Sequence, residues 1–230
     1  MTLFYLIGPS ILAFISALVI ATYSWKRSKL VSGIVLLWAM FAIIVGRISF
    51  FNDSANWQSG DWAGFMIFGI LSFSPAIFLV LASRYLGKFK LFLRDIPIFV
   101  IVLSQIYRVG GIFLLIAYTQ GLLPLSIGLI SGVLDIFVAI SSVFLGIYLR
   151  NNQYKAPKLV IAWATISLLD FVWAVLVIFM SFLGIVSINP APIQMGNPPL
   201  LVISLFAMPL SIFVSVYIIE RTLKNMNLKK

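Results

Sequence analysis

The stretch that decides the fold is 96-IPIFVIVLSQIYRVGGIFLLIAY-118. It is mostly apolar, and its only charged residue is Arg108. It is also long enough to cross a bilayer, because about 20 residues of α-helix span the hydrocarbon core. A strand is a poor alternative, since apolar and polar residues do not alternate and lipid offers no partner to open backbone groups. The stretch therefore predicts a transmembrane helix with an arginine near its middle.

The rest of the chain repeats this pattern. Of the 230 residues, 62% are hydrophobic and 10% are charged, whereas soluble domains are roughly half apolar and a quarter charged. We expect an all-α, multi-pass integral membrane protein in which residues 1–230 form a single domain of seven transmembrane helices. The predicted spans are about 3–24, 30–51, 62–84, 96–118, 124–149, 158–186 and 198–220.

The distribution of positive charge predicts the orientation. Of the 16 lysines and arginines, 14 lie in segments on one side of the predicted membrane, and only Arg47 and Arg108 lie elsewhere. These segments are 26–29, 84–94, 150–158 and 221–230. Cytoplasmic loops are enriched in Lys and Arg, so this side is cytoplasmic, with the N-terminus outside and the C-terminus inside. The net charge of +10 is then a topology signal that also favours contact with anionic lipids at the cytoplasmic face. Nucleic acid is not an expected partner.

The composition also limits the chemistry. The chain contains no cysteine and no histidine, which removes thiolate ligands and the usual haem and zinc sites. Retinal needs a lysine in the last span, and 198–220 contains none. We therefore expect no metal and no cofactor. The compact chain, without a recognisable processing signal, is typical of the prokaryotic cytoplasmic (inner) membrane.

Three charged residues are predicted to lie deep in the membrane: Arg108, Asp135 and Asp170. Counting from the nearest span end places each about 17 Å deep, near the centre of the bilayer. An unpaired ion in hydrocarbon costs several kcal/mol, so an intramembrane salt bridge between Arg108 and Asp135 is expected, with Asp170 nearby. One arginine cannot neutralise two aspartates, so either one carboxyl is protonated or a cation joins the cluster.

Polar side chains one turn before the charges are expected to complete the pocket: Ser104, Gln105, Ser131 and Ser167. Gly128 and Gly132 form a small-residue strip that allows two helices to approach closely beside Asp135. Pro75 and Pro209 fall at mid-span, where each removes a helical hydrogen bond and is expected to kink its helix. Interrupted helices at the level of a charged cluster often form substrate or ion sites in transporters.

These features favour a small transporter or ion-conducting protein, with proton coupling through the aspartates. An alternative is a non-enzymatic scaffold, sensor or accessory subunit of a larger membrane complex or homo-oligomer, in which the charges only lock helices together. A third alternative is an intramembrane enzyme acting on lipid, for which Tyr107 and Tyr118 could serve. The sequence arranges no catalytic residues into a recognisable site, so an enzyme is the least favoured of the three.

Overall fold

The computed structural model describes residues 3–51, 61–151 and 156–227, which form helices and turns without a strand. The first half contains α1 (Leu3–Trp25), α2 (Lys29–Val45), α4 (Trp62–Tyr85), the short α5 (Gly87–Arg94) and α6 (Ile98–Leu103). The second half contains η1 (Ser104–Gly110), α7 (Gly111–Thr119), η2 (Ser126–Ser131), α8 (Gly132–Asn151), α9 (Pro157–Phe182), η3 (Pro192–Gly196), η4 (Ile203–Ala207) and α10 (Met208–Asn227).

The protein is an integral membrane protein of helices. Within the described ranges, six helical stretches are long and apolar enough to cross a bilayer: Leu3–Trp25, Trp62–Tyr85, Ile98–Thr119, Ser126–Asn151, Pro157–Phe182 and Ile203–Met226. The second predicted span, 30–51, is shorter than expected, because α2 ends at Val45. The residues after it turn instead toward the segment before η4, where Phe50 N–H donates to Gly196 O and Phe51 N–H donates to Asn197 Oδ1.

Two other predicted boundaries are displaced. The span expected at 158–186 ends at Phe182, because Gly184 adopts a positive φ of 69° and the Ile185 N–H bonds back to Met180 O. This is the glycine-terminated helix end in which a left-handed residue reverses the chain. The last span, expected at 198–220, begins at Ile203 and its helix continues to Asn227.

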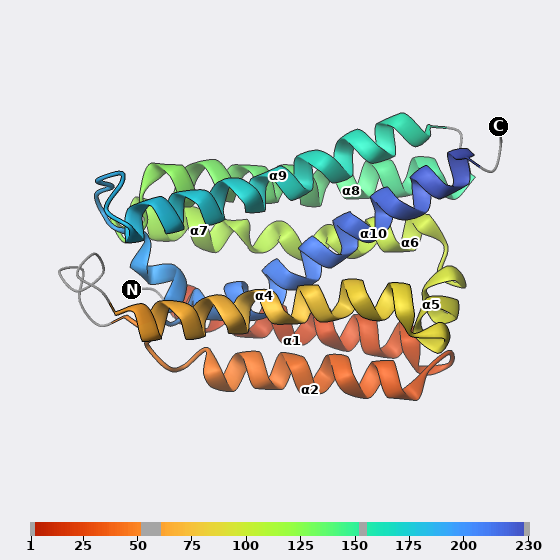
Figure 1. Ribbon diagram of the computed structural model, residues 1–230, viewed down its shortest axis with the longest axis horizontal. Helices are drawn as coiled ribbons and strands as arrows, with labels where there is room; N and C mark the ends of the chain where they lie inside the picture. Colours follow the sequence, from red (N-terminus) through yellow and green to blue (C-terminus); the bar gives the residue numbers. More distant parts are fainter. Residues whose placement is uncertain (1–2, 52–60, 152–155, 228–230) are drawn as a thin grey trace.

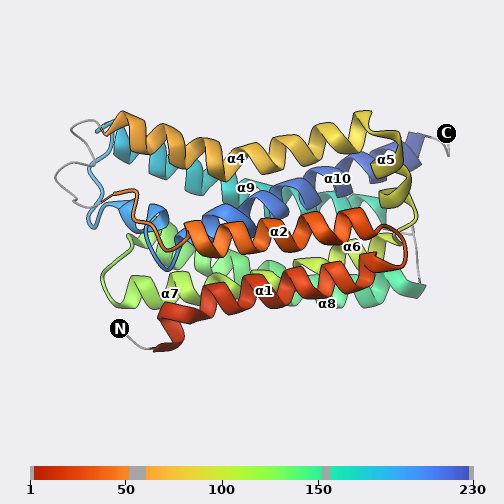
Figure 2. The same ribbon diagram turned by 90° about the horizontal axis from the view of Figure 1, so that it is seen from below.

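The helices form an elongated bundle along one long axis, with the two termini at opposite ends (Figure 1). α1 and α2 lie side by side as an antiparallel pair (Figure 2). α10 crosses the bundle obliquely and contacts α4, α6 and α9. The stretch Ile203–Met226 is also the most enclosed of the six candidate spans, with 61% of it buried. α10 is therefore the central element around which the others pack.

The basic end of the bundle is held together by α5 and α10. α5 lies at the same end of the bundle as the C-terminal end of α10 (Figure 1). The Arg221 guanidinium donates to Leu93 O, Arg94 O and Ile96 O, and so satisfies carbonyls at the end of α5 that lack helical partners. The α1–α2 turn, α5 and the described part of the C-terminal helix thus gather the basic segments at one end.

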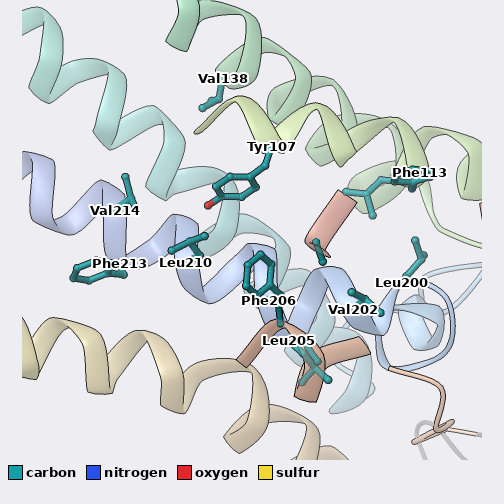
Figure 3. Close-up of a cluster of buried hydrophobic side chains, with 14 of the residues drawn as sticks. Tyr107, Phe113, Val138, Leu200, Val202, Leu205, Phe206, Leu210, Phe213 and Val214 are labelled. Carbon is teal, nitrogen blue, oxygen red and sulfur yellow. The ribbon is translucent and has the colours of Figure 1, made fainter. Parts of the chain in front are cut away.

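The hydrophobic core follows the same central helix. Figure 3 shows Phe206, Leu210 and Val214 of η4 and α10 among side chains from the neighbouring helices. The Tyr107 ring joins this core, with its hydroxyl facing α10 (Figure 3). The core therefore places η1 directly against α10.

Candidate functional site

The site begins with a change of helical pitch. The span Ile98–Thr119 is α-helical at both ends, but its middle, Ser104–Gly110, is a 3₁₀-helix. A 3₁₀-helix has 3.0 residues per turn, so residues three apart eclipse one another. Gln105 therefore shares the face of Arg108, whereas Ser104 is turned about 120° away. Mid-helix 3₁₀ segments often mark functional positions.

Arg108 lies between the two aspartates. Its Nε is 2.5 Å from Asp135 Oδ1 on α8, and its Nη2 is 2.6 Å from Asp170 Oδ2 on α9. The side chains of Arg108 and Asp170 are each 2% exposed, and that of Asp135 is 11% exposed. The intramembrane salt bridge predicted from the depth count is confirmed, with both carboxylates bound to one guanidinium.

The remaining nitrogen and one face of the guanidinium are also occupied. Arg108 Nη1 donates to Ser167 Oγ and lies 3.3 Å from Ser167 O. The Phe171 ring lies 4.4 Å from the guanidinium carbon, close enough for a cation–π contact. Ser167 in turn shares a hydrogen bond of 2.9 Å with Ser215 on α10. Arg108 therefore ties η1 to α8 and α9, and through Ser167 to α10.

Asp170 keeps one oxygen free. Its Oδ1 is buried and, in the described part of the chain, has no hydrogen-bond partner. The buried Ser131 hydroxyl likewise has no hydrogen-bond partner of normal geometry; the group nearest to being its partner is the Asp170 carboxylate, to which its O–H can donate weakly. Buried polar atoms in proteins are almost always paired, so two orphans side by side call for an explanation.

Both orphan groups line a cavity of about 150 Å³. Its walls come from α4, α7, η2, α8, α9, η3, η4 and α10, and most of the lining residues are apolar. Ser131, Asp135 and Asp170 lie at one part of the wall, and Phe65, Phe179 and Met195 lie toward the end of the bundle opposite α5. The cavity therefore extends from the charged cluster toward the end that lacks basic clusters.

Two glycines set the distance between the arginine and its first partner. A Cβ built on Gly111 would lie 2.6 Å from Asp135 Cβ and 2.6 Å from Gly132 O, and one on Gly132 would lie 3.0 Å from Gly111 O. α7 and α8 thus approach with backbone against backbone, as the predicted small-residue strip requires. A Cβ on Gly128 would similarly meet Tyr118 Cβ at 2.5 Å.

Of the other predicted pocket residues, some lie at the charged cluster and some do not. Ser167 contacts Arg108, and Ser131 lines the cavity. Ser104 does not reach the cluster, because its hydroxyl donates to Ile101 O of its own helix, 2.7 Å away. Gln105 is fully buried and accepts from Ser211 Oγ at 3.3 Å.

Two hydroxyl groups of the last span were not predicted from the sequence. Ser211 and Ser215 are both fully buried, and Ser211 Oγ lies 2.6 Å from the Tyr107 hydroxyl. Their spacing of four places them on one helical face, a signal that was available in the sequence. A second cavity of about 30 Å³ is lined by Ser16, Tyr107, Arg108 and Ser211.

The two mid-span prolines lie in different surroundings. Pro75 lies inside α4, which continues through it. Pro209 follows η4, a π-helical segment, and its missing N–H leaves Leu205 O without its usual helical donor. Trp38 Nε1 of α2 donates to that carbonyl at 3.0 Å. The carbonyl that Pro209 frees is therefore used to dock α2.

In the described residues, no group of three or more His, Cys, Asp or Glu side chains could hold a metal ion. Buried around Arg108 are instead two carboxylates, several hydroxyls and an amide, a set suited to binding a proton or a cation. Comparison of the chain with protein-family models, curated proteins and solved structures finds no match.

Proposed function

We propose that this chain is a small transporter or ion-conducting protein that moves a proton or cation through a mid-membrane site formed by Arg108, Asp135 and Asp170. In this proposal it crosses the membrane seven times, with its N-terminus outside and its C-terminus in the cytoplasm. α2 supplies the second crossing. Its 17 residues are about 26 Å long, at the lower end of what spans a bilayer.

The observation that carries the proposal is the free oxygen of Asp170 at the wall of a cavity. With all three groups ionised, the cluster has a net charge of −1, which is unfavourable away from water. A proton on Asp170, or a cation in the cavity beside it, removes the excess charge. The site is thus suited to exchange one positive charge.

The residues would divide the work as follows. Arg108 binds each carboxylate through one oxygen, but Asp135 would be the fixed partner, because the close Gly111–Gly132 contact holds its backbone against η1 and α7. Asp170 would be the exchanging group, since its second oxygen is unpaired. The non-α segments η1, η2 and η4 surround it, and such segments are common at functional sites.

A second candidate is a structural lock in a scaffold or accessory subunit. It is favoured by one specific observation, that Arg108 binds acceptors through Nε, Nη1 and Nη2. A guanidinium bonded on every nitrogen is well suited to holding helices together. In that case a second membrane protein or another copy of the chain would be the functional partner.

Flux measurements separate the two candidates. Proton and cation flux would be recorded in proteoliposomes for the wild type, Asp135→Asn and Asp170→Asn, with the melting temperature of each. The matched control is Asp95→Asn, which changes an exposed carboxyl at the basic end. Transport predicts wild-type flux that Asp170→Asn abolishes while the protein stays folded and Asp95→Asn leaves intact. No flux under any gradient, with both site variants melting well below the wild type, would leave only the lock.

α5 suggests how the protein meets the membrane surface. Lys88 and Arg94 are exposed, while Phe92 and Leu93 of the same helix are buried. Such a helix suits the boundary between lipid and water, with its basic residues toward anionic headgroups. We therefore propose anionic lipid as a partner of the cytoplasmic face. The predicted location in a prokaryotic cytoplasmic membrane stays a proposal.

A further inference from the structure

The wall of the larger cavity combines two kinds of group. Five phenylalanines line it: Phe65, Phe68 and Phe73 from α4, and Phe171 and Phe179 from α9. Its acidic groups are Asp135 and Asp170, and no lysine or arginine is among its lining residues in the described chain. Arg108 pairs with both carboxylates from behind this wall, but one guanidinium leaves a net charge of −1 when all three groups are ionised. This excess negative charge and the negative ring faces together favour a positive charge in the cavity.

The polar groups of the cavity restrict the kind of cation. Inorganic cations such as Ca²⁺ and Mg²⁺ are held by six or more oxygen ligands. Here the oxygens available are few: Asp170 Oδ1 and Ser131 Oγ lack partners of normal geometry, and Asp135 lines the cavity but is bound to Arg108 through Oδ1. Ser204 Oγ is already bonded to Met195 O. A cation that carries its own apolar groups needs fewer oxygens, since the phenylalanines can cover the rest of it.

The volume of the cavity limits the size of such a ligand. An apolar cavity of about 150 Å³ accommodates a molecule of the size of benzene, and this cavity has the same volume. A single ring or a short branched chain with one ammonium group would fill it.

We propose that the cavity binds a small monovalent organic cation, with its ammonium group between Asp170 Oδ1 and the Ser131 hydroxyl and its apolar part against the phenylalanines. This rests on the proposed function and names the class of substrate for the same site. An ammonium N–H donates to Asp170 Oδ1 and, by its charge, neutralises the cluster. A proton on Asp170 has the same charge effect, so the two cations compete for one carboxylate, which gives exchange of organic cation for proton.

Three ligands of similar size and different charge test the proposal. The probes are benzylammonium, benzyl alcohol and benzoate, titrated calorimetrically near neutral pH into the full chain in lipid nanodiscs. The ring is common to all three, so differences report the charge. Benzylammonium should bind at least about tenfold more tightly than benzyl alcohol, because it adds a hydrogen bond to a charged group. Benzoate should bind most weakly.

Two variants locate the binding. Asp170→Asn should reduce the affinity for benzylammonium to that for benzyl alcohol, whereas Asp95→Asn should not change it. Should Asp170→Asn melt too low to use, Phe73→Leu provides the test, since it leaves every charge in place. It should weaken benzylammonium more than benzyl alcohol through loss of a ring face.

The outcomes separate this inference from the proposed function. Equal affinity for benzylammonium and benzyl alcohol, or ammonium binding that survives both variants, would overturn the ligand class. If Asp170→Asn abolishes flux in the same preparations but no ammonium selectivity is found, the transporter stands and the organic cation does not. Selective ammonium binding with no flux under any gradient keeps the ligand class and overturns transport.

Discussion

At the scale of single residues, position 108 requires the shape of arginine as well as its charge. A guanidinium is planar and presents five N–H donors in a fixed fork, and here the fork reaches Asp135, Asp170 and Ser167 from three nitrogens. A lysine carries the same charge on a compact head and cannot bridge acceptors that lie this far apart.

Arg108→Gln should lower the free energy of unfolding in detergent by about 3–5 kcal/mol, since it leaves two carboxylates buried without a cation. Arg108→Lys should recover only part of this loss. Chemical denaturation monitored by tryptophan fluorescence measures both. Arg84→Gln is the control, because its pair with Glu220 is largely exposed and should matter little. An Arg108→Gln protein as stable as the wild type would contradict the assignment.

The two serines near Arg108 should behave differently despite their similar predicted roles. Ser167→Ala removes a hydroxyl that accepts from Arg108 and should cost about 1.5–3 kcal/mol, as for hydrogen bonds to charged groups. Ser104→Ala removes only a bond to its own helix and should change stability by less than about 0.5 kcal/mol. Denaturation midpoints compare the pair directly. Equal losses would mean that residues 104–110 keep α-helical register.

At the scale of the helices, the sequence predicts more about position than about pitch. Run length and uncharged composition located the helices, and the depth count brought Arg108, Asp135 and Asp170 together. Pitch is not encoded in composition, because α, 3₁₀ and π turns differ by small energies that packing against neighbours decides. For that reason Ser104 was expected at the site and lies elsewhere. The end of α2 at Val45 was missed for another reason: the following residues bond to the distant segment at Gly196 and Asn197, which local composition does not reveal.

The contact between Trp38 and the carbonyl freed by Pro209 can be tested as a pair. Trp38→Phe removes the donor to Leu205 O and should destabilise the protein by about 1 kcal/mol or more, since that carbonyl is left without a partner away from water. In a Pro209→Ala background the helix regains its own N–H donor, so the same change should cost less. A double-mutant cycle measures the difference. Costs that are equal in both backgrounds would show that Trp38 acts through packing alone.

At the scale of the whole molecule, the α1–α2 turn, α5 and the last turns of α10 gather basic residues at one end of the bundle. The N-terminus lies at the end opposite α5 and the C-terminus beside it (Figure 1). The seven crossings proposed above would require this separation. In the proposed topology, α2 has to cross the membrane completely, although it is shorter than the six candidate spans.

Cysteine labelling tests this topology cleanly, because the chain has no cysteine of its own. A membrane-impermeant maleimide should label Ile48→Cys and Gln120→Cys in intact cells, and Tyr85→Cys only after permeabilisation. All three positions are exposed. Labelling of Ile48→Cys only after permeabilisation would show that α2 does not cross, and the inverse pattern at all three would reverse the orientation.

The 3₁₀ segment also gives the fourth predicted span a length that depends on its helical pitch. Its seven residues are about 14 Å long as a 3₁₀-helix and about 10.5 Å long as an α-helix. Rewinding it would therefore draw α6 and α7 together by about 3.5 Å and turn one against the other by about 140°. The 3₁₀-helix and the α-helix both form their backbone hydrogen bonds within the segment, so the surrounding lipid does not oppose conversion of one into the other. A change in the length of this span would therefore also change the direction in which the Arg108 guanidinium points.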